Sequence, residues 1–223
     1  MTDPNQAPPK PRIRLHFAKK SQVKYISHLD LALSWERALR RAQIPLAYSQ
    51  GFNPRPKMQV ASGLPLGTTG RAEIMDITLT ESIDLETSLE RIQATLPVGI
   101  GLHAIEEIPA RSPALQSLLR QAEYEVIVET DLSEMMLTDR IQTLLEADQI
   151  LQTRIRRKKE ETFDLRPWVH DLRLISMTNN DAQLYMRLTA GQFGNLRPEQ
   201  LLKALGLEDN WANIERTRLI FEA

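Results

Sequence analysis

SHLDLALSWERALRRA, residues 27–42, is the stretch that decides the fold of the first half of the chain. Its apolar side chains recur at helical spacing and form one stripe, made of Leu31, Trp35, Ala38, Leu39 and Ala42. Ser27 stands in the N-cap position with Asp30 three residues later, a variant of the capping box. The pattern therefore predicts an amphipathic helix over residues 28–42, which Pro45 ends.

Strand patterns flank this helix. Residues 13–17 (IRLHF) alternate apolar and polar side chains, as a half-buried strand does. Further along, the sequence predicts a short strand or extension at 23–26, strands at 58–61, 74–79 and 101–108, a turn-rich segment at 63–71 and a helix at 85–96. The expected order is strand, helix, strand, strand, helix, strand.

The same order returns in the second half of the chain, after a helix expected at 114–122. The predicted elements are a strand at 124–129, a helix within 132–147, paired strands at 150–156 and 161–165 across a basic turn, a strand at 184–189, a helix at 197–205 and a strand at 216–221. RPWVHDLRLIS, residues 166–176, is an additional segment between the middle strands. No clear repeat is found at the residue level, so the duplication is inferred from element order alone.

This order predicts an α+β fold of two consecutive ferredoxin-like β-α-β-β-α-β units, each an antiparallel sheet with two helices on one face. The other sheet face would be free for a partner. We expect the first domain at residues 12–112 and the second at 113–223. Residues 1–11 (MTDPNQAPPKP) are polar and rich in proline, which is typical of a disordered leader or linker.

Composition excludes several kinds of chemistry. The chain has no cysteine, which excludes disulfides, cysteine nucleophiles and cysteine-ligated iron–sulfur clusters. Its four histidines, His16, His28, His103 and His170, are not paired at metal-ligand spacing. We therefore expect no metal and no cofactor. No apolar run approaches the ~20 residues that span a bilayer, and no signal peptide is found, so a soluble cytoplasmic protein without membrane contact is expected.

Charge is segregated along the chain although the net charge is only −1. Residues 10–57 contain eleven Lys or Arg and two acidic residues, whereas residues 71–150 contain five basic and sixteen acidic ones. A positive face of this kind suits phosphate or an acidic partner. The alternative is two solvated faces that have no partner.

YSQGFNPRPKMQ, residues 48–59, follows the arginine-rich end of the helix. Gly51 permits a positive φ, while Pro54 and Pro56 fix φ and restrict the residues before them. The stretch predicts a stiff loop that presents an aromatic ring and basic side chains. Asn53 has two readings, a polar contact to a base or a stabilising contact within the turn, and the second is favoured.

The mixture of basic and aromatic side chains is typical of surfaces that bind single-stranded RNA. The candidates in and before the loop are Arg37, Arg40, Arg41, Tyr48, Phe52, Asn53, Arg55 and Lys57. A second basic run, whose members Arg154, Arg156, Arg157, Lys158 and Lys159 lie at a hairpin-like tip, suits phosphate contact without sequence preference. Each residue alone is also compatible with an ordinary solvated charge.

Four further polar residues have competing interpretations. Asp30 is favoured as a helix cap, whereas for His28 a cap and a functional role, as an acid or base or in a partner contact, fit equally well. Asp164 and Arg166 in DLRP are interpreted as a structural salt bridge in preference to a site. No residue is assigned a catalytic role.

ISHLDLALSWERALRRAQIPLAYSQGFNPRPKMQVASGLPLG, residues 26–67, resembles a bacterial family of radical-SAM-linked domains of unknown function. DLRPWV (164–169), RPEQLLKALG (197–206) and RTRL (216–219) resemble its later blocks, so the likeness covers nearly the whole chain after residue 11. Such domains are fused to, or encoded beside, cobalamin-binding radical SAM proteins, which implies a partner of that kind. The family loop usually reads GFNPHP, and Arg55 stands here in place of its His, which disfavours a general base and retains phosphate contact.

These features favour a non-catalytic RNA-binding module that works with a radical SAM partner, in tRNA or rRNA modification. An RNA-processing endonuclease is the alternative, because CRISPR RNA-processing endonucleases also double the ferredoxin-like unit. His28 or His16 with Arg40 or Arg55 would then supply the chemistry, by fold analogy alone. A third hypothesis is a protein–protein adaptor whose acidic middle segment meets a basic partner.

Overall fold

The computed structural model describes residues 10–156 and 159–222, and only the backbone of 154–156 and 159. In chain order the first elements are β1 (Arg12–Lys19), η1 (Ser21–Val23), α1 (His28–Arg41), β2 (Met58–Val60), β3 (Thr68–Thr78), α2 (Leu85–Gln93) and β4 (Ile100–Ile108). They are followed by α3 (Leu115–Leu118), β5 (Leu119–Glu129), α4 (Glu134–Glu146), β6 (Leu151–Arg156), β7 (Lys159–Asp164), η2 (Arg166–Trp168), β8 (Val169–Thr178), β9 (Asp181–Thr189), α5 (Pro198–Ala204) and β10 (Ala212–Phe221).

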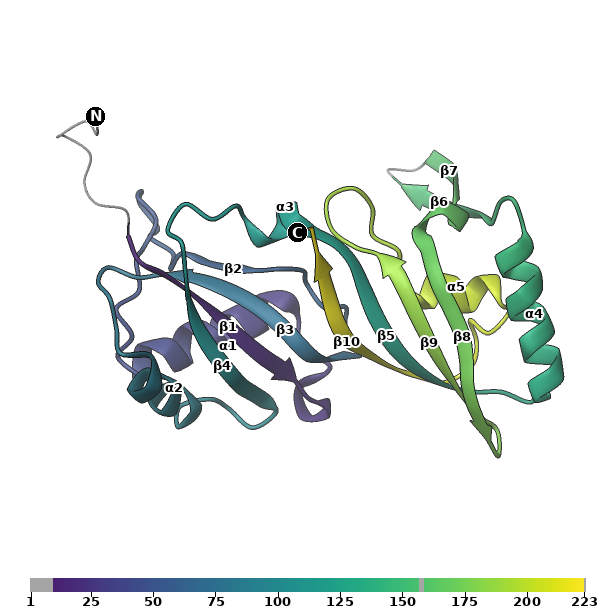
Figure 1. The fold of residues 1–223 in the computed structure, drawn as a ribbon, viewed down its shortest axis with the longest axis horizontal. Helices are drawn as coiled ribbons and strands as arrows, with labels where there is room; N and C mark the ends of the chain where they lie inside the picture. The colour runs from purple at the N-terminus through teal and green to yellow at the C-terminus, as the bar shows by residue number, and fades with distance from the viewer. Residues whose placement is uncertain (1–9, 157–158, 223) are drawn as a thin grey trace. The chain divides into compact units, whose positions relative to one another are not determined.

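The chain divides into two compact units. The first comprises the residues up to Leu66 and Arg71–Ser117, and the second comprises Gly67–Gly70 and Leu118–Ala223. The first three residues of β3 therefore belong to the second unit, although the rest of the strand belongs to the first. Figure 1 labels the elements in both units.

The first unit has the strand order β4-β1-β3-β2, and both β4 and β2 pair antiparallel with their neighbours. α1 begins at a complete capping box, in which Asp30 N–H donates to Ser27 Oγ at 3.1 Å and Ser27 N–H donates to Asp30 Oδ2 at 3.3 Å. The expected helix is confirmed within one residue at its C-terminal end. Leu31, Trp35 and Leu39 pack with Ile92 of α2 in the same buried cluster.

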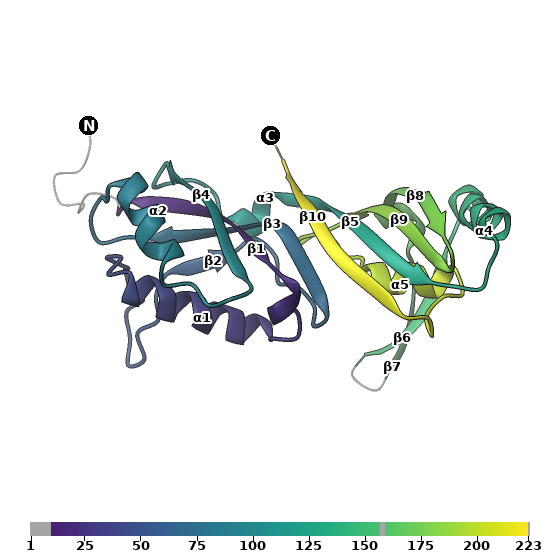
Figure 2. The same cartoon turned by 90° about the horizontal axis from the view of Figure 1, so that it is seen from below.

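The core of this unit lies on one face of its sheet. Alternate residues of β1, Ile13, Leu15 and Phe17, are buried in that cluster, and the ring centroids of Phe17 and Trp35 lie 5.1 Å apart. Because side chains of a strand alternate between faces, Arg12 and Arg14 lie on the opposite face. Figure 2 shows α1 beside one face of these strands.

The second unit has the strand order β10-β5-β9-β8, with antiparallel pairing between each pair of neighbours. Val126, Leu172 and Leu184 are buried on its core side. The three residues Thr68–Gly70 add a short parallel strand beside β10, and Thr69 Oγ1 donates to Ile214 O at 3.3 Å. β6 and β7 pair with each other as a separate two-stranded sheet.

Four expectations from the sequence are wrong in detail. The segment at 23–26 is not a strand, because η1 and a turn occupy residues 21–26. The turn-rich segment at 63–71 contains the start of β3, and the helix expected at 114–122 is the four-residue α3 followed at once by β5. RPWVHDLRLIS is no extra segment, since most of it is β8, which pairs with β9 in the main sheet. The paired strands β6 and β7 are the insertion.

Within residues 10–156 and 159–222, no helix combines the length and the apolar character that crossing a bilayer requires.

Candidate nucleic-acid interface

The loop between α1 and β2 is a short hydrogen-bonded hairpin, which we call the QGFN loop (residues 47–57). Its arms are joined by Ser49 N–H to Arg55 O at 2.8 Å and by Lys57 N–H to Ala47 O at 2.8 Å. Arg55 N–H donates in turn to Ser49 Oγ at 2.9 Å. Five backbone groups and a hydroxyl therefore hold the arms together, and the tip is presented on a fixed base.

Phe52 stands at the tip of the QGFN loop and is 106% exposed. Gly51 beside it has a φ of +131°, a conformation that side chains other than glycine rarely adopt, so the reversal expected there is present. An anchoring role for Phe52 in the core is excluded by this exposure. The side chain of Asn53 makes no hydrogen bond to another described residue, so the turn-stabilising contact expected of it is absent.

The two arms of the loop have different surroundings. Tyr48 is half-buried and packs against the core of the first unit, so this ring anchors the loop and is only partly available for stacking. Arg55 and Lys57 are exposed on the other arm, and neither side chain has a hydrogen bond or ion pair with a described residue. The loop thus combines one half-buried ring, one exposed ring and two cations that are not engaged by other described residues.

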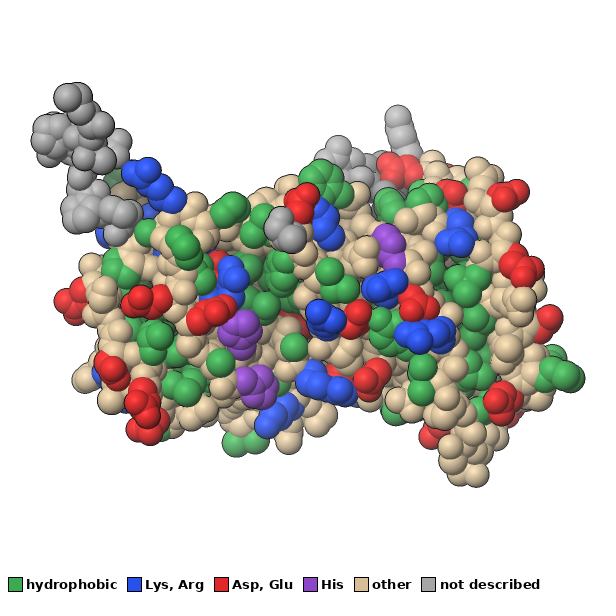
Figure 3. All heavy atoms as spheres, in the orientation of Figure 1, with side chains coloured by type: hydrophobic (Ala, Val, Ile, Leu, Met, Phe, Trp, Pro, Cys, Tyr) green, Lys and Arg blue, Asp and Glu red, His purple; other side chains and the backbone are tan. Residues whose placement is uncertain are grey.

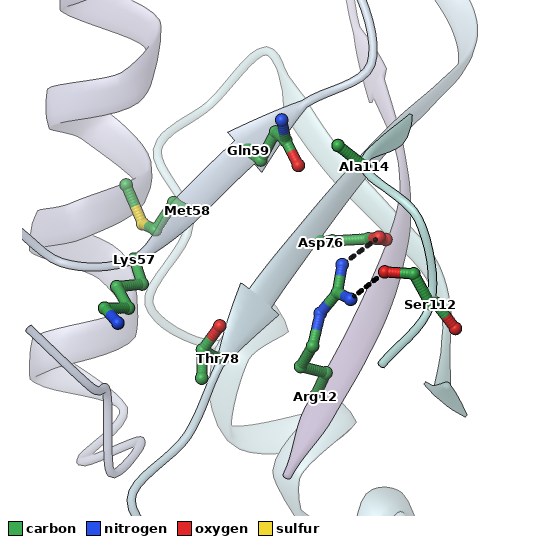
Figure 4. A pocket seen from close by; sticks show the side chains of 8 residues that line it. All are labelled: Arg12, Lys57, Met58, Gln59, Asp76, Thr78, Ser112 and Ala114. Carbon is green, nitrogen blue, oxygen red and sulfur yellow. Dashed lines mark hydrogen bonds and ion pairs between the residues drawn. The ribbon is translucent and has the colours of Figure 1, made fainter. Parts of the chain in front are cut away.

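A groove of about 410 Å³ adjoins the second arm. It is lined by Arg12, Lys57, Met58, Gln59, Asp76, Thr78, Ser112 and Ala114. Arg12 Nη1 donates to Ser112 O at 2.6 Å and Arg12 Nη2 donates to Asp76 Oδ2 at 3.1 Å, as Figure 4 shows. The side chain of Lys57 extends away from this pair, so its ammonium group can reach a ligand without breaking it.

Asp76 is the electrostatic centre of this groove. Its side chain is buried and also accepts from Arg14 at 2.8 Å and 3.2 Å, so two guanidinium groups share one carboxylate. Their net charge of +1 lies on the sheet face opposite the core. Sequence reasoning missed this cluster, because Arg12 and Asp76 are 64 residues apart and meet only through the sheet.

The three arginines of α1 differ in what they contact. Arg41 Nη2 donates to Thr95 O at 2.6 Å, and Arg40 Nη1 lies 3.7 Å from Glu36 Oε1. Arg37 is exposed and its side chain has no such contact with a described residue. α1 lies on the core side of the sheet, whereas Lys57 lines the groove with Arg12 on the opposite face. A single patch that joins the α1 arginines to the QGFN loop stays a prediction.

The other candidate polar groups have mainly structural contacts. Asp30 caps α1, as expected, and the exposed imidazole of His28 lies against Gly63 without a hydrogen bond to a described residue. The carboxylate of Asp164 accepts from the backbone N–H groups of Ile150 and Arg166 at 2.8 Å and 2.9 Å. The guanidinium of Arg166 donates to Leu145 O at 2.8 Å. The expected Asp164–Arg166 salt bridge is therefore replaced by two separate backbone contacts.

Most of the second basic run lies beyond what the structure describes. β6 and β7 are antiparallel, with Arg156 opposite Lys159, which confirms the expected pairing of the strands. Arg157 and Lys158 lie outside the described residues, and the side chains of Arg154, Arg156 and Lys159 are not described either. Their role in binding stays a prediction.

The sheet face of the second unit opposite its core is polar and mixed in charge. Arg173 stacks on the ring of Tyr185 at 4.6 Å and pairs with Asp171 at 3.1 Å. Burial, followed by the hydrogen bond and charge of Glu123, raises the pKa of Tyr185 above 10.0. Partial burial and then the charge of Arg187 hold the pKa of His170 below 6.5.

Acidic and basic side chains therefore alternate over the strands of this unit (Figure 3). In the described part of the chain, no group of three or more His, Asp or Glu side chains is placed to hold a metal ion.

Three solved structures overlap with almost the whole chain at low sequence identity. They are described as "Crystal Structure of a Cbf5-Nop10-Gar1 Complex" (16% identity, 98% of this chain and 55% of that chain, TM-score 0.50), "Structure of H/ACA RNP bound to a substrate RNA containing 2'-deoxyuridine" (14%, 98% and 53%, 0.47) and "Crystal structure of the archaeal box H/ACA sRNP Nop10-Cbf5 complex" (16%, 98% and 54%, 0.44). This chain spans about half the length of these three chains. At this identity the first structure indicates a similar fold and nothing about function. The TM-scores of the other two are below 0.5, and we infer nothing from them.

Sequence comparisons give a family and no curated relative. No curated protein matches the chain. The profile of a family described as "Uncharacterized protein conserved in bacteria (DUF2344)" matches residues 12–198, which is more than half of the 223 residues. The match runs from β1 to the first residue of α5 and includes the QGFN loop. The chain therefore belongs to this bacterial family.

Proposed function

We propose that this protein is a non-catalytic RNA-binding accessory module, which contacts a single-stranded segment of RNA through the QGFN loop. The observation that carries the proposal is Phe52, a fully exposed aromatic ring at the tip of a hydrogen-bonded hairpin. Burying such a side chain is worth roughly 1.5–3 kcal/mol, so a chain that only had to fold would gain by covering it. A ring held in water is instead suited to stacking on an unpaired base.

The neighbours of Phe52 support a nucleic-acid ligand. Arg55 and Lys57 follow it on the same arm, and their side chains are exposed and not engaged with other described residues. A base on the ring and its phosphates on these cations would place the strand along the second arm. The hairpin is already closed, so little conformational entropy is lost when it binds.

The remaining candidates are ranked by what they contact. The side chain of Arg37 has no hydrogen bond or ion pair with a described residue, whereas Arg40 and Arg41 are partly engaged by Glu36 and by Thr95 O. We therefore rank Arg37 second in importance, after the residues of the QGFN loop. The basic residues 156–159 complete the proposal as a contact to phosphate without sequence preference.

The architecture and the partner belong to the same proposal. Each unit has the element order β-α-β-β-α-β, with β6 and β7 inserted in the second. We propose that both are ferredoxin-like domains, divided near residue 113. The resemblance to radical-SAM-linked domains suggests a radical SAM partner in the cytoplasm. Because this chain has no cysteine, such a partner would supply any cysteine-ligated cluster itself.

An adaptor is the second candidate, because Leu29 and Leu33 are exposed one turn apart on α1. The endonuclease alternative gains no comparable support. His28 has no hydrogen-bond partner within residues 10–156 and 159–222, and His16 Nε2 lies 3.0 Å from Glu106 Oε1 on the sheet face opposite the core.

The proposal is tested by the fluorescence anisotropy of a labelled single-stranded RNA at several salt concentrations. Phe52→Ala and the pair Arg55→Ala with Lys57→Ala should each weaken binding. Lys20→Ala and Leu66→Ala are matched controls, an exposed cation beyond the far end of β1 and an exposed apolar residue outside the loop. If the loop variants bind as tightly as the controls do, RNA binding by the QGFN loop should be abandoned.

A further inference from the structure

A second loop of the chain repeats the QGFN loop in sequence. Residues 50–56 read QGFNPRP and residues 192–198 read QFGNLRP. Gln, Asn, Arg and Pro stand at the same four positions, and the Gly and Phe between Gln and Asn have changed places. We call residues 190–197, which join β9 to α5, the QFGN loop.

The two loops occupy different connections but the same end of their units. The QGFN loop enters β2, whose first residue, Met58, pairs with Ile77 near the end of β3. The QFGN loop leaves β9, whose Leu188 pairs with Val169 at the start of β8. In each unit these two consecutive strands, β2 and β3 or β8 and β9, are antiparallel, so the start of the first and the end of the second lie at the same end of the sheet. The repeat therefore places the same side chains at corresponding ends.

The QFGN loop is fixed at its base. Ala190 N–H donates to Arg120 O at 2.9 Å, and Leu196 N–H donates to Thr189 O at 3.0 Å. Gly191 has a φ of +107°, and a Cβ there would lie 2.5 Å from Leu119 O, so only glycine fits. Like the QGFN loop, it has a base fixed by backbone hydrogen bonds, from which its tip projects.

Phe193 stands at the tip of this loop and is 67% exposed. The guanidinium carbon of Arg120 lies 4.6 Å from its ring centroid, and Arg120 also pairs with Glu222. The cation holds the ring in place while most of the ring remains in water. An exposed ring braced in this way is a stacking platform.

A groove of about 820 Å³ lies at this loop, and its lining includes Gln192 and Gly194, the residues on either side of Phe193. It is lined by Trp168, Gly191, Gln192, Gly194, Asn195, Arg197, Glu199 and Gln200. Gly194 packs directly on the indole, since a Cβ there would lie 3.2 Å from Trp168 Cε2. The side chains of Gln192, Asn195 and Arg197 have no hydrogen bond or ion pair with a described residue, so their amide and guanidinium groups are available to a ligand.

We propose that the QFGN loop and this groove form a nucleotide-binding site. The base stacks on Phe193, the amides of Gln192 and Asn195 meet its edge, and the guanidinium of Arg197 contacts its phosphate. An amide presents a donor and an acceptor side by side, which suits the edge of a base, and a guanidinium suits phosphate oxygens. The proposal deepens the RNA-binding function and rests on it for the source of the nucleotide, an RNA strand.

The test uses the full chain with two probes. One is a labelled single-stranded RNA followed by anisotropy, and the other is a set of free nucleoside monophosphates followed by tryptophan fluorescence. Trp168 lies in the groove and Trp35 is buried, so a bound nucleotide should quench mainly the former. The third tryptophan, Trp211, is 58% exposed, so the fluorescence is measured in a Trp211→Ala background. Trp211 directly precedes β10, whereas Arg120 lies near the opposite end of that strand.

Phe193→Ala and Arg197→Ala should each weaken RNA binding roughly fivefold or more, and Phe193→Tyr should keep it. Trp211→Ala and Arg218→Ala, an exposed aromatic and an exposed cation elsewhere in the unit, should bind as the unaltered chain does. Melting curves confirm that each variant is folded. The side chain of Arg197 has no hydrogen bond to Arg120, Trp168 or another described residue, so Arg197→Ala keeps the test valid if Phe193→Ala unfolds.

The outcomes separate this proposal from the one on which it rests. If RNA binding depends on Phe52 but not on Phe193 or Arg197, the second site is overturned and the RNA-binding function stands. If RNA does not bind but monophosphates quench Trp168 in a Phe193-dependent way, the nucleotide site stands and the RNA-binding function fails. If neither probe responds to Phe193→Ala or Arg197→Ala, the nucleotide site is overturned.

Discussion

The QGFN loop and the QFGN loop carry the same side chains on differently built supports. Phe52 has no aromatic or cationic neighbour among the described residues, whereas Phe193 is braced by Arg120 and precedes Gly194, which packs on the indole of Trp168. The glycines differ in the same sense, since nothing lies within 4 Å of a Cβ built on Gly51 and a Cβ on Gly191 would overlap Leu119 O. The sequence of the tip is therefore repeated, while each unit holds the tip by its own contacts.

The two loops should differ most in the cost of replacing their glycines. Gly191→Ala should lower the free energy of unfolding by roughly 2–4 kcal/mol, because the positive φ alone costs about 1–3 kcal/mol and the Leu119 carbonyl must also move. Gly51→Ala should cost only about 1 kcal/mol, since the position is open. Urea unfolding of both variants measures the difference. Equal costs would show that the second loop is not held more tightly than the first.

The next effect separates stacking from support at the two phenylalanines. Phe52→Ala should weaken RNA binding by roughly 1–3 kcal/mol and leave the melting temperature unchanged, because its ring contacts little protein. Phe193→Ala should cost a similar affinity and also about 0.5–1 kcal/mol of stability, through the lost contact with Arg120. Anisotropy and thermal melting measure the two quantities. A clear loss of stability in Phe52→Ala would place its ring against the protein.

A smaller effect distinguishes free from engaged arginines. Arg55→Ala and Arg197→Ala should each reduce the salt slope for single-stranded RNA by about 0.7, the value for one phosphate contact. Arg41→Ala should leave the slope unchanged and lower stability by about 0.5–1 kcal/mol, because its guanidinium donates to Thr95 O. Binding is measured at several salt concentrations beside unfolding curves. A fall in slope for Arg41→Ala would return the α1 arginines to the interface.

The smallest effect is a pH dependence that only the second loop should show. His170 Nε2 lies 2.8 Å from Thr189 Oγ1 at the base of the QFGN loop, and the pKa of this histidine is held below 6.5. The unfolded chain therefore binds more protons than the folded one below that pH, so stability should fall as pH falls from about 7 to about 5. His170→Gln should flatten this part of the stability curve, measured by urea unfolding. An unchanged curve would show that the histidine titrates as it does in the unfolded chain.

Much of the fold was predictable because local signals and tertiary contacts agree. The apolar stripe of residues 28–42 and the Ser27 cap predicted α1 within one residue at its end, and both are present. The start of β3 was missed, because Thr68–Gly70 has no strand pattern of its own and becomes extended by pairing with β10, 146 residues away at Ile214. β8 was missed because Pro167 and charged residues at its start interrupt the alternation.

For the candidate site too, features with a local sequence signal could be predicted and features that depend on strand pairing could not. The stiff loop and the exposure of Phe52 were predicted from Gly51, the two prolines and the composition of residues 48–59. The Arg12–Asp76 pair depends on strand neighbours and had no local signal. The second loop did have one, since QFGNLRP stands in the sequence, but the exchange of Gly and Phe hides it from a comparison in register. Only the structure shows that both copies are exposed tips.

The placement of Gly67–Gly70 in the second unit affects how the protein can be dissected. A fragment that begins at residue 113 would contain all of β5 to β10 but would lack this segment. The N–H and C=O groups of β10 that now pair with Thr68–Gly70 would then form an open edge. Open edges recruit other strands, so the isolated half should self-associate, whereas a version that carries residues 67–70 as a linked peptide should remain monomeric. Each unit is compact, but the second includes residues 67–70, which the chain supplies from within the first half.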